Sequence, residues 1–165
     1  MKKLLLGITI LSLVVFASSA MAQTAKVPKS LCLSHSTWTG HYDKLAFKSF
    51  SSVPTSSGNA KIYAMHGFAY SGYSAPVFGT GYVAPGGTVL HVSYSGQGSS
   101  SLHRQRSYEL FFDLATNTGT LYYTFYYVDG TTIVSDSESV ALADCASQPI
   151  PSAMASGAFG QPEGE

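Results

Sequence analysis

The chain has 165 residues, of which only 11% are charged, and its nine basic and nine acidic groups cancel. Hydrophobic residues make up 45% and aromatic residues 13%, which is enough for one core of ordinary size. Without Lys2 and Lys3, which lie in the leader described next, the balance is slightly acidic, and this argues against nucleic acid or anionic lipid as the main partner.

The first 22 residues have the pattern of a secretory signal peptide. Lys2 and Lys3 form a positive start, and Leu4–Phe16 is an apolar run that is short for a membrane span. Ala20 and Ala22 supply the small residues that a signal peptidase needs. We therefore expect cleavage after Ala22 and a periplasmic or secreted bacterial protein. A membrane anchor is the alternative, and the short run disfavours it.

The remaining chain divides into three parts by composition. Residues 23–31 are expected to be a flexible segment, and residues 32–145 form the folded domain. Residues 146–165 hold three Pro and three Gly without periodicity, which is typical of a disordered tail. A body of about 115 residues is the size of one small domain.

Strand-like segments recur along this domain, and no segment has the apolar spacing of a helix. The first covers Ser36–Phe47 and is followed by a Ser-rich loop, "SFSSVPTSSGN". The others are expected at residues 60–70, 77–83, 88–95, 107–114, 120–128 and 131–142, with a break in the last near residues 136–139. Seven or eight antiparallel strands with short connections predict an all-β up-and-down barrel, with a two-sheet β-sandwich as the alternative. We favour the barrel because closure removes exposed strand edges.

Two cysteines, Cys32 and Cys145, stand at the two edges of the domain. An exported protein meets an oxidising environment, so we expect them to form a disulfide. Such a bond holds two Cα atoms within roughly 6 Å, which would bring the first strand beside the last. Two lone cysteines without a Cys-x-x-Cys or His-x-x-x-His partner predict no metal site.

The segment at residues 120–128 carries large side chains at almost every position. One face of a strand here holds Leu121, Tyr123, Phe125 and Tyr127, and the other holds Tyr122, Thr124, Tyr126 and Val128. We assign the first face to the barrel interior. The second face has two interpretations: sheet stability through cross-strand aromatic pairs, which we favour, or a contact patch made of Tyr122 and Tyr126.

The stretch "LSHSTWTGHY", residues 33–42, resembles the opening strand of lipocalin-like and avidin-like barrels. Those families begin with Gly-x-Trp, whereas Ser36 takes the place of the glycine here. Trp38 is followed by Thr39-Gly40-His41-Tyr42, similar to the start of many small secreted bacterial barrels. The resemblance implies a calyx that holds a small, mostly apolar ligand, with Trp38 packed across its floor.

No catalytic grouping stands out. "GYSAP" around Ser74 departs from Gly-x-Ser-x-Gly, and the five histidines lack metal-ligand spacing. His66 and His91 could approach each other across a barrel, so a histidine metal site is an alternative, which the spacing disfavours. The basic stretch "HRQRS", residues 103–107, is expected to be a solvated loop. Turns or outward faces are expected for the carboxylates Asp113, Asp129, Asp136 and Glu138. We expect no metal and no cofactor, and an enzyme is the less favoured interpretation.

The leading hypothesis is an exported, non-enzymatic β-barrel that binds a small hydrophobic or aromatic molecule. The expected lining residues are Trp38, Tyr94, Phe112, Tyr123 and Phe125. One alternative is a structural or interaction protein (a surface or matrix component, or an inhibitor) that uses Tyr122 and Tyr126. Two others are a hydrolase built around His66 or His91 and an eight-stranded outer-membrane barrel, which the polar tail disfavours. The partner is thus a small apolar molecule or another protein, and the oligomeric state stays open.

Overall fold

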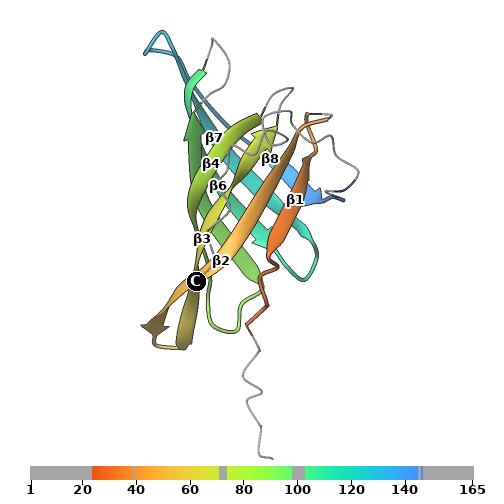
Figure 1. The fold of residues 1–165 in the computed structure, drawn as a ribbon, viewed down its shortest axis with the longest axis vertical. Coiled ribbons are helices and arrows are strands. Elements are labelled where there is room, and N and C mark those ends of the chain that lie inside the picture. Colours follow the sequence, from red (N-terminus) through yellow and green to blue (C-terminus); the bar gives the residue numbers. More distant parts are fainter. Residues whose placement is uncertain (1–23, 39, 71–73, 98–102, 145, 147–165) are drawn as a thin grey trace, which may run out of the picture.

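The computed structural model describes residues 24–38, 40–70, 74–97, 103–144 and 146. These residues form eight antiparallel strands in one closed up-and-down barrel, in which each strand pairs with the next and the last pairs with the first (Figure 1). The strands are β1 (Ser30–His35), β2 (Tyr42–Thr55), β3 (Gly58–Tyr70), β4 (Ser74–Val83), β5 (Val89–Gln97), β6 (His103–Asp113), β7 (Thr118–Tyr127) and β8 (Ile133–Leu142). The predicted barrel is confirmed, and the sandwich alternative is wrong.

Some sequence expectations lie outside the described residues. These are the signal peptide at residues 1–22, Cys145 and the tail beyond residue 146. Within the described ranges, no helix is long and apolar enough to cross a membrane.

The predicted first strand, Ser36–Phe47, is wrong because it contains a turn. β1 ends at His35 and β2 begins at Tyr42. In the connection, Gly40 has φ +79°, a left-handed conformation that glycine adopts at little cost. The amide of His41 donates a hydrogen bond to the carbonyl of Trp38 at 3.0 Å. Trp38 therefore lies in the β1–β2 turn rather than in a strand.

Three further predictions of loops or breaks are also wrong. The Ser-rich stretch after Phe47 is the second half of β2, which pairs with β3 as far as Thr55 opposite Gly58. The basic stretch at residues 103–107 begins β6, and β8 runs unbroken through residues 136–139. Serine has a weak strand preference, but the ladder bonds belong to the backbone, so a paired neighbour holds a Ser-rich strand in place.

Apolar side chains that alternate along the strands fill the barrel interior. Leucine, valine and phenylalanine side chains with no exposed surface make up its centre: Leu33, Leu45, Val77, Val83, Leu90, Val92, Leu110, Phe112 and Leu121. The barrel closes where β1 pairs with β8 over only three residue pairs, from Leu33↔Leu142 to His35↔Val140. This closure, which we call the seam, is the shortest ladder of the eight.

The two ends of the barrel differ. The Trp38 end carries the β1–β2, β3–β4, β5–β6 and β7–β8 connections, and the hairpin end carries the other three. The segment before β1 packs at the hairpin end, where Val27 is buried in the core and the Lys29 carbonyl accepts from the Phe47 amide at 2.9 Å. The core therefore includes a residue that precedes the predicted domain boundary at residue 32.

Cys32 lies buried on β1 near the chain's exit from β8. Its carbonyl accepts a hydrogen bond from the Ala143 amide at 2.7 Å. The two edges of the domain are thus side by side, as the expected disulfide requires. The bond itself stays a prediction because Cys145 lies outside the described residues.

Candidate functional site

Three aromatic rings gather at the Trp38 end. Alternation along β7 turns Tyr123 and Phe125 towards the interior, and the β1–β2 turn brings Trp38 against both. Ring centroids lie 4.9 Å apart for Trp38 and Tyr123, 6.0 Å for Trp38 and Phe125, and 4.9 Å for Tyr123 and Phe125. Tyr123 is buried, whereas Trp38 and Phe125 are half-buried. We call these three residues the aromatic group.

A cluster of charged side chains lies next to the aromatic group. His35 Nδ1 is 2.6 Å from Glu138 Oε1, and His35 Nε2 is 3.5 Å from Asp43 Oδ1. The other Asp43 oxygen accepts a hydrogen bond from the Tyr94 hydroxyl at 2.5 Å. All three charged side chains are at most 4% exposed. These four residues, the His35 cluster, connect β1, β2, β5 and β8 and so cross the seam.

The two carboxylates change the protonation of His35. Burial, the largest single influence, lowers the pKa of this imidazole, but hydrogen bonds and charges from Asp43 and Glu138 together outweigh it and raise the pKa to about 9. Burial, and then the charge on Asp43, raises the pKa of Tyr94 well above its usual value. Near neutral pH the cluster therefore holds a charged imidazolium and a neutral phenol.

His41 completes this end of the barrel. Its ring lies 5.3 Å from Trp38, and its Nδ1 is buried without a hydrogen-bond partner among the described residues. Burial, and then the positive charge on His35, lowers its pKa. A neutral imidazole with an unused ring nitrogen therefore borders the aromatic group.

Arg106 supplies a second buried positive charge. It is 4% exposed, and its guanidinium carbon lies 5.3 Å from the centre of the Phe125 ring, a cation–π arrangement. The sequence placed it in a solvated loop and placed Glu138 on an outward face, and both expectations are wrong because both side chains point inward. The two-residue period of a strand could have predicted these inward positions. Arg106 lies two residues before Tyr108, and Glu138 lies two residues before Val140, and both Tyr108 and Val140 are buried.

The structure brings together four of the five expected lining residues. Tyr94 stacks on Tyr108 at 4.7 Å, and Tyr108 meets Phe125 edge-on at 6.3 Å, which connects Tyr94 to the aromatic group. Phe112 does not join them. It lies fully buried opposite Gly119, beside the β6–β7 turn at the hairpin end.

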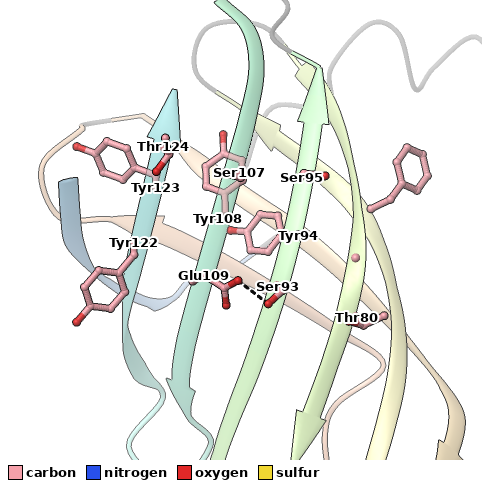
Figure 2. Close-up of a pocket in the computed structure, with 12 residues that line it drawn as sticks. Thr80, Ser93, Tyr94, Ser95, Ser107, Tyr108, Glu109, Tyr122, Tyr123 and Thr124 are labelled. Carbon is pink, nitrogen blue, oxygen red and sulfur yellow. Dashed lines mark hydrogen bonds between the residues drawn. The ribbon is translucent and has the colours of Figure 1, made fainter. Parts of the chain in front are cut away.

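The outer face of β4–β7 carries a second aromatic arrangement. A row of rings crosses four strands in the order Tyr82, His91, Phe111 and Tyr122, with centroid separations of 5.0, 4.4 and 6.0 Å. Beside this row lies an open groove of about 380 Å³ that contains Ser and Thr side chains and Glu109 (Figure 2). Tyr122 points outward at its edge and is 49% exposed, and Tyr126, further along β7, is 39% exposed.

The groove also holds a serine and a carboxylate, and a histidine of the ring row lies beside them, but the three are in the wrong order for hydrolysis. Ser93 Oγ donates to Glu109 Oε1 at 2.6 Å, and His91 Nε2 is 2.6 Å from Glu109 Oε2. A serine nucleophile needs its proton taken by the histidine, whereas here both groups contact the carboxylate.

The histidine pair considered for a metal site is also separated. His66 is exposed on the outer side of β3, and β4 separates it from His91, so the two do not meet across the interior. Among the described residues, no group of three or more His, Cys, Asp or Glu side chains suits a metal ion.

Comparison with known proteins gives no match: no family model, no curated protein and no solved structure is similar to this chain. Of the resemblance to lipocalin-like and avidin-like barrels, the structure therefore confirms only the closed meander of eight antiparallel strands, and no comparison supports membership of those families.

Proposed function

We propose that the protein is an exported, non-enzymatic barrel that binds a small aromatic or hydrophobic molecule at its Trp38 end, in the periplasm or outside the cell. The observation that carries this proposal is the half-buried aromatic group beside a layer of fixed charges. Trp38 and Phe125 are half-buried, so part of each ring stays accessible to an incoming molecule, and an aromatic pair adds about 0.5–1.5 kcal/mol beyond the area that it buries.

The charges beside the aromatic group favour a ligand of low charge. Two carboxyl groups, Asp43 and Glu138, share this layer with two basic groups, His35 and Arg106, so neither sign dominates. His41, whose ring lies 5.3 Å from that of Trp38, adds a neutral polar side chain at the edge of this site. This combination of apolar walls and few polar groups is typical of small-molecule sites.

The outward positions support a barrel that is not membrane-spanning. β5 and β8 carry serines on their outer faces: Ser93, Ser95, Ser135, Ser137 and Ser139. Apart from the His35 cluster and Arg106, the interior is apolar, the reverse of the arrangement in outer-membrane barrels.

The test uses Trp38, the single tryptophan of the chain, as its reporter. Titration with N-phenyl-1-naphthylamine, a neutral apolar aromatic probe, should quench Trp38 emission to saturation. Phe125→Ala should weaken the probe's affinity by about tenfold, corresponding to one lost aromatic contact. The matched control is Tyr122→Ala, which alters the same strand on its outer face and should leave the affinity within about twofold. Unsaturable quenching, or equal losses in both variants, would refute the site.

A second candidate function is an interaction with another protein through the outer aromatic row. Its supporting observation is the continuous set of rings from Tyr82 to Tyr122, with Tyr126 nearby and exposed. The double variant Tyr122→Ser/Tyr126→Ser should then lose a partner that co-purifies with the wild type while its melting temperature stays the same. A partner that remains bound to this variant excludes the outer row.

A further inference from the structure

The hairpin end carries a feature that the proposed ligand site does not use. An open groove of about 750 Å³ lies between the segment before β1 and the β2–β3 hairpin. Its floor includes the rings of Phe47 and Tyr63, which are almost fully buried. Its walls include four lysines, Lys26, Lys29, Lys48 and Lys61.

These four lysines concentrate the positive charge of the described chain. The described residues contain five lysines, and only Lys44 lies outside this groove. No ion pair joins the four to a carboxylate within the described ranges. Apart from the buried Asp43, the described carboxylates belong to β6–β8 and their connections: Glu109, Asp113, Asp129, Asp136, Glu138 and Asp144. The near-zero net charge is therefore the sum of two separate regions, a lysine-rich one at the groove and a carboxylate-rich one on β6–β8.

The hairpin beside the lysines exposes apolar side chains. β2 and β3 continue beyond the barrel as a projecting hairpin (Figure 1). The register shift between Ser49 and Ser51 leaves Phe50 unpaired and 77% exposed, and Val53 is 48% exposed. A large ring held in water at the rim of a basic groove has no role in the core.

We propose that the hairpin end docks on the surface of an anionic phospholipid membrane. The lysine ammonium groups contact the lipid phosphates, and Phe50 and Val53 enter the boundary between headgroups and acyl chains. Basic residues beside exposed aromatic residues are the composition that peripheral membrane-binding segments use. A nucleic acid fits less well, because phosphate and base recognition favours arginine and several stacked rings, whereas this groove has lysines and one exposed ring.

Vesicle co-flotation tests this proposal on the mature chain. The protein should float with phosphatidylcholine vesicles that contain phosphatidylglycerol, should stay behind with pure phosphatidylcholine, and should be released by high salt. Lys48→Gln/Lys61→Gln should weaken binding by about thirtyfold, the loss expected for two lysines near an anionic surface. Phe50→Ser should weaken binding about tenfold and leave its salt dependence unchanged.

The matched control is Lys44→Gln, which removes an exposed lysine of the same strand outside the groove and should change binding less than twofold, roughly. Circular dichroism checks that each variant is folded. Equal binding to neutral vesicles overturns the proposal, and so does a loss in Lys44→Gln that matches the double variant. A single-stranded oligonucleotide that binds more tightly than the vesicles assigns the groove to nucleic acid instead. Phe125→Ala should leave vesicle binding unchanged, which separates this site from the proposed ligand site.

Discussion

Raising the pH should weaken the barrel at its seam, through His35. The folded protein raises the pKa of this imidazole from 6.5 to about 9, so folding favours the protonated form. A group of this kind stabilises the fold fully below pH 6.5, its pKa in the unfolded chain, and the stabilisation is lost as the pH rises through 9. At about 1.4 kcal/mol per unit, the free energy of unfolding should fall by roughly 3 kcal/mol across this window.

The buried position of His35 at the seam explains why its deprotonation should lower the free energy of unfolding. The side chain is only 4% exposed, so solvent screens its contacts with Glu138 and Asp43 little. The contact with Glu138 crosses the seam, where β1 and β8 share only three residue pairs. Deprotonation therefore removes an attractive charge from the shortest ladder of the barrel.

Urea unfolding at a series of pH values measures the effect. Far-UV circular dichroism should follow it rather than Trp38 emission alone, because the Trp38 ring stacks 5.9 Å from His35 and responds to its charge. His35→Gln should flatten the pH dependence between 6.5 and 9. The control is His91→Gln, since His91 is also 2.6 Å from a carboxylate, Glu109, but the two side chains of this pair are 23% and 49% exposed. Exposed pairs contribute about 0–1 kcal/mol, so this variant should keep the wild-type profile.

Two results would refute this reasoning about the seam. One is an unfolding free energy that stays constant between pH 6.5 and pH 9 in the wild type. The other is a His91→Gln variant whose profile is as flat as that of His35→Gln, which would assign the titration to the surface.

The remaining predictions concern the same fold. Glu138→Gln leaves a buried imidazolium with one carboxylate fewer and should lower stability by about 3–5 kcal/mol in urea unfolding near neutral pH. Gly79→Ala places a Cβ against the backbone carbonyl oxygen of Ser93 and should lower stability by about 1–3 kcal/mol. Gly81→Ala, whose new Cβ has its nearest atom at 3.4 Å, should lower stability far less, and thermal melts of the two variants measure the difference. Mass spectrometry after alkylation without reductant should find Cys32 and Cys145 joined and unmodified, and two alkylated thiols would exclude the bond.

The sequence predicted the barrel because local signals agreed along most of it. β5 alternates Leu90, Val92 and Tyr94 inward, and tight turns separate the later strands. The β1–β2 turn was not predicted because the segment from Trp38 to His41 interrupts the strand-like pattern only briefly. Gly40 is the one residue in it that is typical of a turn. The outer half of β2 was missed because its serines have a weak strand preference, and β3 supplies the ladder that holds them.

The charged residues of the site were harder to predict, because charged side chains are rarely buried without partners. The two-residue period places Asp43, Glu138 and Arg106 at inward positions. The neighbouring sequence, however, does not indicate which residues will pair with them. The partner of Glu138 is His35, from the opposite end of the domain, and it arrives only when the barrel closes. Burial of these groups is therefore a consequence of topology rather than of local sequence.

The same closure connects the seam to the proposed ligand site. His35 holds β8 through Glu138, and its ring stacks against Trp38, which forms one wall of that site. A molecule that binds only when Trp38 is in place favours the closed seam, so ligand binding and protonation of His35 stabilise the same state of the barrel. By linkage, each must then strengthen the other, since both depend on β1 and β8 staying together.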